Sequence, residues 1–385
     1  MIISRISIKN WRNFKTIDTP LSERQFVVGP NASGKSNFLD VFRFLRDIAK
    51  SDGGGLQKAV QTRGGVSKIR CLAARRDPDI EIDVSLSDDD ENSTAVWRYS
   101  IGIRQEQRGF RQPLLSHEHV WKEGRLILNR PDRDDKKDEE RLKQTHLEQV
   151  SANKEFREVA RFFEAITYLH LVPQLLRYPE LSQASRLEND PFGQGFLERV
   201  AKAPPKTQLA RLRKIEEALK IAVPQLEQLK FERDTTTGQP HLLALYSHWR
   251  PNAGWQSEDQ FSDGTLRLIG LLWSLFEGQS PLLLEEPELS LNDGVTRHLA
   301  GIIRRLQRSR RRQAIISTHS EALLNDEGIG GNEILMLFPS KEGTEAKIAT
   351  EDRDLAELLG AGLPPGDIVL SKTRVKGAEQ LGLFE

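Results

Sequence analysis

The stretch Gly29-Pro30-Asn31-Ala32-Ser33-Gly34-Lys35-Ser36 decides the fold of this chain, because it matches the pattern G-x-x-x-x-G-K-[ST] in full. Phe26 to Val28 lead into it as a short apolar strand, and apolar residues from Phe38 to Leu45 follow at helical spacing. The glycines allow the backbone to wrap around a phosphate, so that N–H groups and the helix N-terminus point at the anion. The alternative, a chance glycine turn, does not require a strand, a loop and a helix in this order. The sequence therefore predicts that the chain binds a nucleoside triphosphate.

Within this loop, Lys35 is expected to reach the β- and γ-phosphates, and the Ser36 hydroxyl is expected to bind Mg²⁺. ATP and Mg²⁺ are accordingly the expected cofactors. The residues expected to contact the nucleotide are Gly29, Asn31, Gly34, Lys35, Ser36 and Asn37.

The composition excludes several classes of protein. A length of 385 residues indicates one large domain or two closely packed ones, with ample core. The 56 basic and 56 acidic residues leave no net charge, so bulk charge gives no argument for or against nucleic acid. A single cysteine, Cys71, excludes an intramolecular disulfide and fits a reducing compartment. The start lacks the apolar core of a signal peptide, and the longest apolar runs are too short to span a bilayer, so we expect a soluble cytoplasmic protein without membrane contact.

Periodicity divides the chain into four expected parts. Residues 1–130 hold the phosphate loop and a predicted antiparallel meander with one solvated face. Residues 131–228 are a predicted helical insertion, which opens with the mixed-sign run Pro131–Glu140 as a solvated loop. The meander strands are expected at Ile80–Leu86, Trp97–Ile103 and Val120–Leu128, with a turn at Asp88–Ser93, and the insertion helices at 156–166 and 209–219.

Residues 229–345 predict a second lobe with a parallel sheet, and residues 346–385 a polar tail. Apolar segments with the length of buried strands alternate here with helical patterns, which is typical of a parallel α/β sheet. Strands are expected at 241–246, 281–285, 314–317 and 333–338, and helices at 266–276 and 295–306.

Two adjacent carboxylates follow an apolar segment in Leu282-Leu283-Leu284-Glu285-Glu286-Pro287. Successive residues of a strand face opposite sides, so the two carboxylates can take separate roles. We expect Glu285 to hold Mg²⁺, directly or through water, and Glu286 to polarise the attacking water. An acidic pair after a strand is common in proteins, but it becomes a strong signal when it follows a phosphate loop.

A histidine follows the next apolar segment, in Ser317-Thr318-His319-Ser320. At that edge of a sheet, His319 could hydrogen-bond the γ-phosphate and report its presence. The alternative is a histidine that caps the next helix.

A second anion site is predicted at Phe261-Ser262-Asp263-Gly264-Thr265-Leu266-Arg267, which opens a helix with a hydroxyl, a carboxylate and a glycine. One nucleotide does not need two phosphate sites in one chain. We therefore expect this segment to complete the nucleotide pocket of a second protomer. Its site residues are Ser262, Asp263, Gly264 and Thr265.

Taken in order, these motifs make the chain resemble the RecF/SMC-like, ABC-type ATPases, most closely a compact bacterial branch related to the ATPase half of OLD-family proteins. The order is a phosphate loop, a long insertion, S-D-G-T-L-R, L-L-L-E-E-P-E and S-T-H-S, and the Asn10–Phe14 turn is similar to the family's N-terminal motif. The resemblance covers roughly residues 1–48 and 255–338. It implies an α/β fold, a P-loop NTPase of the ABC/SMC-head type with an antiparallel β subdomain and a helical insertion.

The resemblance also implies an assembly. Two copies would form a head-to-tail homodimer with ATP between them, so that Lys35 and Ser36 of one chain face Ser262 and Gly264 of the other. The catalytic residues implied are Glu286 and His319, and the implied residues of the loop that crosses the interface, Leu289–Asn292, are Ser290 and Asn292.

The sequence departs from the family pattern at two points. The metal carboxylate is usually an aspartate, and Glu285 is longer, although glutamate also occurs in this branch. The signature carries Asp263 and Thr265 in place of the usual second glycine and glutamine, and an acid near the γ-phosphate would slow turnover unless it points away. The glutamine that senses Mg²⁺ in the family stays open among Gln57, Gln61 and Gln174.

Two polar segments have a functional and a plain interpretation. The run Arg304–Arg312 could grip DNA phosphates, but a solvated helix end is favoured because no aromatic residues interleave with it. Asp352 and Asp354 could imitate part of a metal site, but a surface loop is favoured, because the stretch after His319 is too short for the Toprim nuclease domain of OLD-type proteins. No Cys/His cluster has zinc spacing, so we expect a partner to carry out any cutting of nucleic acid.

The expected function is an ATP-driven dimeric switch, whose closure gates DNA binding or a separate effector, expected to be a nuclease encoded nearby, in DNA repair or phage defence. One alternative is the nucleotide-binding subunit of a membrane transporter, which the long insertion between Lys35 and Ser262 disfavours. The other is a scaffold that binds ATP but hardly hydrolyses it, which Asp263 and Glu285 keep open.

Overall fold

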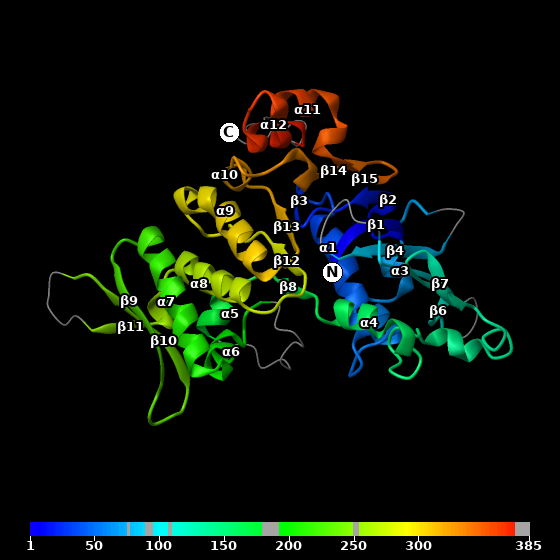
Figure 1. Cartoon of the computed structure of the whole chain (residues 1–385), viewed down its shortest axis with the longest axis horizontal. Coiled ribbons are helices and arrows are strands. Elements are labelled where there is room, and N and C mark those ends of the chain that lie inside the picture. Colours follow the sequence, from blue (N-terminus) through cyan, green and yellow to red (C-terminus); the bar gives the residue numbers. More distant parts are fainter. Residues whose placement is uncertain (75–77, 89–94, 107–109, 179–191, 249–253, 374–385) are drawn as a thin grey trace, which may run out of the picture.

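A parallel sheet lies at the centre of the computed structural model, which describes residues 1–74, 78–88, 95–106, 110–178, 192–248 and 254–373 (Figure 1). Its strand order is β15-β14-β3-β13-β12-β8, and all neighbours are parallel except β14 and β15. The strands are β3 (Arg24–Val28), β8 (Thr167–Leu169), β12 (Leu282–Glu285), β13 (Ala314–Thr318), β14 (Ile334–Ser340) and β15 (Gly343–Ile348).

An antiparallel sheet in the order β2-β1-β4-β5-β6-β7 packs beside it and contains the predicted meander. The single strand expected over Val120–Leu128 is wrong, because Glu123 and Gly124 adopt positive φ (48° and 79°) and make a tight hairpin turn there. The turn expected at Asp88–Ser93 lies outside the described residues except for Asp88. The strands are β1 (Ile2–Trp11), β2 (Phe14–Pro20), β4 (Ile80–Ser87), β5 (Trp97–Gln105), β6 (Pro113–Lys122) and β7 (Arg125–Arg130).

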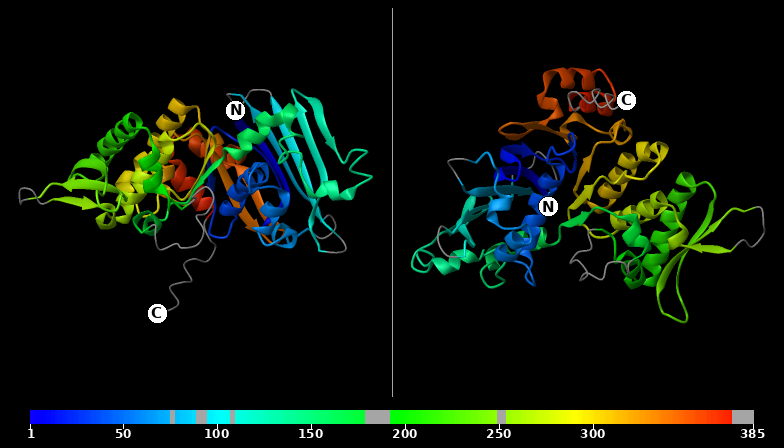
Figure 2. Two further views of the ribbon diagram at one scale, coloured as in Figure 1. Left: turned by 90° about the horizontal axis from the view of Figure 1, so that it is seen from below. Right: turned by 180° about the vertical axis from the view of Figure 1, so that it is seen from behind.

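A third sheet, β11-β10-β9, is also antiparallel. It lies at the opposite end of the molecule from the six-stranded antiparallel sheet (Figures 1 and 2). Its strands are β9 (Leu226–Arg233), β10 (Pro240–Tyr246) and β11 (Trp255–Ser257). The expectation that residues 241–246 join the parallel sheet is therefore wrong. The reason is local: the Asp234 carboxylate accepts hydrogen bonds from the Thr236 and Thr237 N–H groups at 2.8 and 2.6 Å, and this turn folds β10 back onto β9.

Helices cover both faces of the parallel sheet, and the two expected insertion helices are present as α4 and α7. The expected polar tail is wrong for its described residues, because β15, α11 and α12 fold there and bury Leu355 and Val369. The helices are α1 (Lys35–Ala49), α2 (Leu56–Gln61), α3 (Val66–Ile69), α4 (Arg157–Glu164), α5 (Pro173–Arg177), α6 (Phe196–Lys202), α7 (Pro205–Ala222), α8 (Asp263–Phe276), α9 (Asp293–Arg310), α10 (Glu321–Leu324), α11 (Arg353–Gly360) and α12 (Pro365–Lys372).

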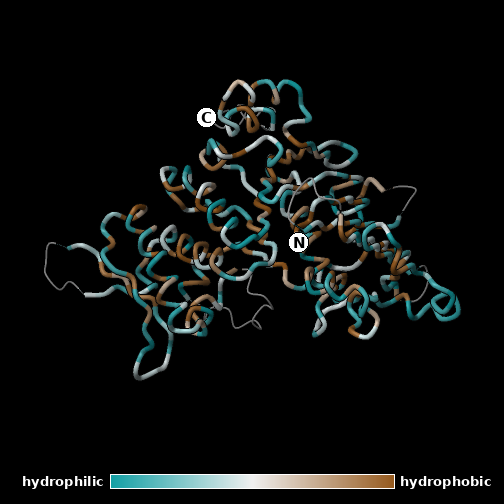
Figure 3. The backbone as a smooth tube through the Cα atoms, in the orientation of Figure 1, coloured by the Kyte–Doolittle hydropathy of each residue, from teal (hydrophilic) through white to brown (hydrophobic). Residues whose placement is uncertain are grey.

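The parallel sheet separates two hydrophobic cores, because alternate residues of its strands face opposite sides. Val27, Leu283 and Ile315 join the core formed with α1 and the six-stranded antiparallel sheet. Leu282 and Leu284 join the other core, with α8 and α9. Figure 3 shows the corresponding hydrophobic colour along the central strands and hydrophilic residues along the outer hairpins. The sheet is therefore buried on both faces, and its strand ends are the open places where a ligand can bind.

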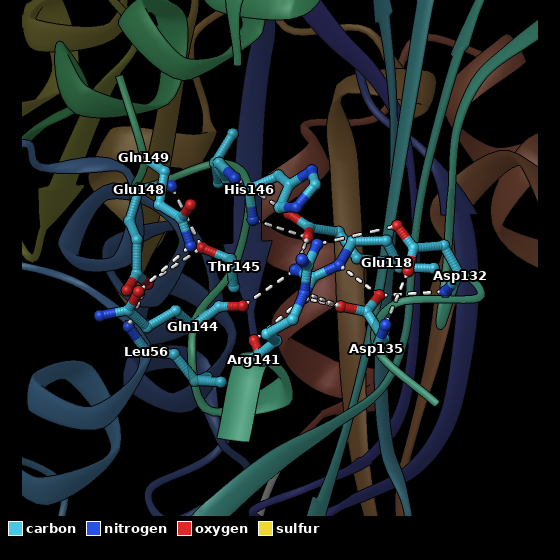
Figure 4. A network of polar contacts seen from close by, with 12 residues as sticks. Leu56, Glu118, Asp132, Asp135, Arg141, Gln144, Thr145, His146, Glu148 and Gln149 are labelled. Atoms are coloured by element: carbon cyan, nitrogen blue, oxygen red, sulfur yellow. Dashed lines mark hydrogen bonds and ion pairs between the residues drawn. The ribbon is translucent and has the colours of Figure 1, made fainter. Parts of the chain in front are cut away.

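A buried ionic network joins the antiparallel sheet to the segment that follows it (Figure 4). The Arg130 guanidinium donates to both oxygens of Asp135 at 2.9 Å and to Glu118 at 3.1 Å, and the three side chains are at most 1% exposed. Although burial alone would raise it, hydrogen bonds from Arg130 hold the pKa of Asp135 well below its usual range. The expectation of a solvated loop over Pro131–Glu140 is therefore wrong at Asp135, which pins this run to the sheet.

Candidate nucleotide-binding site

The strand order of the parallel sheet brings the predicted motifs to one edge. The phosphate loop follows β3. His319 lies at the C-terminal end of β13, and the Glu285–Glu286 pair lies at the C-terminal end of β12. Because β13 lies between β3 and β12, His319 stands between the phosphate loop and the carboxylates. The carboxyl ends of parallel strands meet at the same edge of a sheet, so sequence motifs that are far apart converge here.

The phosphate loop is shaped by its glycines. Gly34 has φ of 101°, and a Cβ there would lie 2.2 Å from Asn13 Nδ2. That Asn13 amide donates to the Ser33 carbonyl at 2.8 Å and to the Thr344 hydroxyl at 2.6 Å, which ties the loop to β15. A Cβ on Gly29 would lie 2.6 Å from Ser33 Oγ. Both glycines are therefore required by the loop conformation itself, before any ligand is considered.

Lys35 is buried at the start of α1, only 7% exposed, and its ammonium donates to the Gly29 and Pro30 carbonyls at 2.9 and 3.3 Å. Burial lowers the pKa of Lys35, while the carboxylates of Glu286 and Glu285 oppose the shift. The lysine thus lies curled over its own loop, where a phosphate can replace the two carbonyls as its partner.

Glu285 is held at both of its oxygens. The Ser36 hydroxyl donates to Oε1 and the Tyr168 hydroxyl donates to Oε2. Burial and the Glu285 carboxylate raise the pKa of Tyr168, which keeps this hydroxyl protonated. A hydroxyl and a carboxylate oxygen in direct contact are hard oxygen ligands, so Ser36 and Glu285 fit Mg²⁺ in a site shared with nucleotide phosphates.

Glu286 contacts the histidine. Its Oε1 lies 3.0 Å from His319 Nδ1, and the His319 side chain is 49% exposed. Glu286 has φ of 45°, a strained value for a residue with a Cβ, and its carbonyl accepts from Arg267 at 3.2 Å. A partly exposed carboxylate next to a histidine can accept a proton from a water molecule placed against it.

A third carboxylate, Glu288, lies behind this pair and is 7% exposed. Its Oε1 accepts from the Thr318 hydroxyl at 2.5 Å, whereas its Oε2 has no hydrogen-bond partner among the described residues. Burial raises the pKa of Glu288, with Thr318 opposing the shift. Glu288 is not among the predicted site residues, although it stands in the same acidic run.

The predicted second anion site lies at the N-terminus of α8. Ser262 is exposed and caps the helix, with its Oγ 3.2 Å from the Thr265 N–H and 2.8 Å from the Thr265 hydroxyl. A Cβ on Gly264 would lie 2.5 Å from the Ser290 carbonyl, so the signature segment abuts the Leu289–Asn292 loop. Ser290 is exposed as well, with φ of 65°. The two segments that the resemblance assigns to an interface therefore share one surface.

Asp263 does not project freely from this helix end. Its Oδ1 accepts from Arg177 at 2.8 Å and its Oδ2 accepts from Gln174 at 3.1 Å. Arg177 also donates to the Phe261 carbonyl at 2.6 Å. The charge of Asp263 is thus matched by an arginine of α5, a residue that sequence reasoning missed.

The three candidate glutamines lie in different places. The Gln57 amide donates to the Pro113 and Lys143 carbonyls at 2.9 and 2.7 Å, and neither of these two residues belongs to a site motif. Gln61 is exposed on α2. Gln174 follows β8, the neighbour of β12 in the sheet, and is the one that contacts the signature.

Two of the three predicted asparagines, Asn37 and Asn292, make hydrogen bonds within the fold. The Asn37 amide donates to Asn13 at 2.8 Å, which steadies the phosphate loop from behind. Asn292 caps α9 by accepting from the Gly294 N–H at 2.8 Å. Asn31 is exposed in the loop.

The two polar segments are more ordered than the sequence predicted. The interpretation of Arg304–Arg312 as a solvated helix end is wrong for Arg312, which is 5% exposed and donates to the Ser274 and Glu277 carbonyls at 2.9 and 2.6 Å. Asp352 is not in a loop but caps α11 by accepting from the Leu355 N–H at 3.2 Å. In the described ranges, no group of three or more His, Cys, Asp or Glu side chains could hold a metal ion.

Comparison with known proteins agrees with this architecture. A family model described as "AAA domain, putative AbiEii toxin, Type IV TA system" matches residues 26–325. A structure of the Smc head bound to the C-winged helix domain of ScpA has 16% identity and a TM-score of 0.53, and the match covers 90% of this chain and 98% of that one. The Smc head with an extended coiled coil, bound to the C-terminal domain of ScpA from Pyrococcus furiosus, has 14% identity and a TM-score of 0.51, with 94% and 99% covered. No curated protein matches the chain.

Within the described part of the chain, none of the helices combines the length and the apolar character needed to cross a bilayer. The family match spans most of the sequence and includes the phosphate loop, the signature segment, the acidic pair and His319. This chain therefore belongs to the AAA-domain family that the model describes, and its fold is that of an SMC-head, RecF-like, ABC-type P-loop ATPase.

Proposed function

We propose that this protein hydrolyses ATP to ADP and phosphate, and that two copies enclose the nucleotide as a switch. The observation that carries the proposal is the meeting of the phosphate loop, Glu285, Glu286 and His319 at adjacent strand ends, with Glu286 and His319 3.0 Å apart. This arrangement supplies a phosphate cradle, a metal position and a proton acceptor in one place.

In this mechanism each side chain has one task. Lys35 exchanges its loop carbonyls for the β- and γ-phosphates, and Ser36 and Glu285 hold Mg²⁺, which when bound offsets the phosphate charge. Glu286 orients the attacking water and takes its proton. His319, hydrogen-bonded to Glu286, fixes that carboxylate and turns its other ring nitrogen toward the γ-phosphate.

The second copy is proposed to supply the signature. Ser262 and Ser290 lie together on the surface, and the described partners of Ser262 and Asp263 are in α5 and α8 rather than in the phosphate loop. Although Ser262 caps the Thr265 N–H, the positive end of the dipole of this 14-residue helix favours an anion that arrives from outside. A head-to-tail pair would place each signature against the phosphate loop of the other copy.

We assign Gln174 as the glutamine that reports Mg²⁺ and nucleotide, because it follows the strand next to β12 and its amide donates to Asp263. The pairing of Asp263 with Arg177 and Gln174 answers the concern that an acid in the signature repels the γ-phosphate. The carboxylate is already neutralised within its own chain, so hydrolysis is compatible with this departure from the family pattern.

The output is proposed to be control of a separate effector, expected to be a nuclease encoded nearby, or of DNA, in phage defence or DNA repair. The family description names a toxin of a toxin–antitoxin system, and both Smc heads are bound to a domain of ScpA, which supports a head that acts through another protein. We place this activity in the cytoplasm, which fits the free buried thiol of Cys71.

ATP turnover by Glu286→Gln tests the catalytic assignment. Loss of the proton acceptor should lower kcat by about 100-fold or more, while a labelled ATP analogue still binds. Glu342→Gln is the matched control, because Glu342 is 64% exposed and pairs with Lys15 at the surface, so its turnover should equal that of the wild type. Equal turnover by wild type and Glu286→Gln would overturn the assignment.

A further inference from the structure

We propose that Tyr168 is a positioning residue for the metal carboxylate: its hydroxyl holds the long side chain of Glu285 in the place where it meets Ser36. This inference deepens the proposed function and rests on the assignment of Ser36 and Glu285 to Mg²⁺. The two oxygens of Glu285 have one hydroxyl partner each, Ser36 on Oε1 and Tyr168 on Oε2.

The register of the sheet explains why Tyr168 reaches Glu285. β8 is the parallel edge neighbour of β12, and Tyr168 is paired with Leu283. Paired residues of adjacent strands point to the same face, and so do residues two apart on one strand. Tyr168, Leu283 and Glu285 therefore share a face, and the length of the tyrosine ring carries its hydroxyl one pair further along the sheet.

The ring of Tyr168 is clamped in this position. Tyr168 is 5% exposed, and the Arg43 guanidinium carbon lies 4.1 Å from its ring centroid. Arg43 is in turn held by Asp40, with Nη1 3.8 Å from Oδ1. Asp40 and Arg43 belong to α1, the helix that begins with Lys35 and Ser36, and residues 36, 40 and 43 lie on one side of it. One helix thus supplies the ligand hydroxyl and, two turns later, the arginine that covers the tyrosine.

The chemical need for such a residue follows from the glutamate. Glu285 has one more rotatable bond than an aspartate and could swing toward the ammonium of Lys35, whose charge interacts with it. A second donor on Oε2 removes that freedom before any ligand arrives. Hydrogen-bond partners behind a metal ligand contribute about 10–100-fold to metal affinity in characterised sites.

Tyr168→Phe tests the inference, because it deletes the hydroxyl and keeps the buried ring. Mn²⁺ binding in the presence of ADP, followed by electron paramagnetic resonance, should weaken by about 10-fold. The Mg²⁺ concentration for half-maximal ATP turnover should rise by a similar factor, while kcat at saturating Mg²⁺ and ADP binding in EDTA stay close to wild type. Tyr246→Phe is the matched control, since it deletes a hydroxyl on β10, in the other antiparallel sheet.

A double variant separates positioning from packing. Aspartate at 285 is too short to reach Tyr168, so Tyr168→Phe should have no further effect on Mn²⁺ affinity in the Glu285→Asp background. The proposal is overturned if Tyr168→Phe binds Mn²⁺ as tightly as the wild type, or if its effect is unchanged in that background. The Mn²⁺ measurement does not require hydrolysis, so a failure of the ATPase assignment would be seen separately, as equal turnover by wild type and Glu286→Gln.

Discussion

Two groups of acidic residues in this molecule differ in how fully the protein supplies their hydrogen-bond partners. In the antiparallel sheet, Glu118 accepts from Tyr99, Arg130 and the N–H groups of His146 and Leu147. At the strand edge, Glu286 has a half-exposed histidine as its side-chain partner, and Glu288 leaves one buried oxygen without a partner among the described residues. The first group is satisfied by the protein alone, and the second is left ready for a ligand.

This difference separates acidic residues that stabilise the fold from acidic residues that are available to a ligand. A buried charge with a full set of partners is costly to disturb, because any single removal leaves the others unpaired. An incompletely satisfied group costs stability on its own, and proteins retain such groups mostly at functional sites. The strained φ of 45° at Glu286 likewise costs stability and is typical of a functional site.

Removing the cation from the satisfied group should have the largest effect. Arg130→Met removes from the buried carboxylates of Glu118 and Asp135 the guanidinium that they share, and we expect a loss of about 3–5 kcal/mol in the free energy of unfolding. Denaturant titration measures it. Arg98→Met is the matched control, because the Arg98–Asp83 pair is at the surface, with Arg98 53% exposed, and should contribute within about 1 kcal/mol. Equal losses for the two variants would contradict the distinction.

The same substitution at one carboxylate of each group sharpens the comparison. Glu118→Gln places an amide NH₂ among groups that donate hydrogen bonds to Glu118, and it removes the negative charge that pairs with Arg130. We therefore expect about 2–3 kcal/mol of destabilisation. Glu288→Gln, whose Oε2 has no partner among the described residues to lose, should change stability by less than about 1 kcal/mol. Parallel thermal and denaturant unfolding of both variants measures the difference, and a larger loss for Glu288→Gln would reverse the assignment of roles.

A smaller effect is expected from pH. Burial, with Arg130 adding to it, lowers the pKa of His146 to about 4, below the value of ~6.5 for an unfolded histidine. Between these values the unfolded chain binds more protons, so the stabilisation is complete above about pH 6.5 and is lost as the pH falls toward 4. Because the imidazole is partly exposed, we expect about 1 kcal/mol. Unfolding titrations at pH 7 and pH 5 should show this slope in the wild type and a flatter one in His146→Gln, and an identical slope in both would count against it.

The parts of the site that the sequence predicts are those encoded by contiguous motifs. The phosphate loop, Glu285, Glu286 and His319 each follow a short apolar strand, and parallel pairing then brings the strand ends together. Prediction fails where a role depends on a contact across the fold. Tyr168 lies in a strand of three residues, which is too short to show periodicity, and Asn13 reaches Thr344 across 331 positions.

The fold shows the same division. The alternating strands and the amphipathic helices carry their own periodicity, whereas the hairpin at Glu123–Gly124 interrupts an apolar pattern without changing it. Asp135 stands in a run of charges that has the composition of a solvated loop, and its contacts with Arg130 and Arg141 explain its burial. Composition cannot report a partner that lies on another strand.

The central claim is that each ATP site is shared between two copies, and a mixing experiment tests it most directly. Lys35→Ala removes the phosphate ligand, and Ser262→Arg blocks the signature surface, so each variant alone should be inactive. In a mixture, the heterodimer has one site with an intact phosphate loop from one copy and an intact signature from the other. Turnover should therefore recover to about a quarter of the wild-type value. Two folded, inactive variants whose mixture stays inactive, or a Ser262→Arg variant with full turnover, would contradict the shared site.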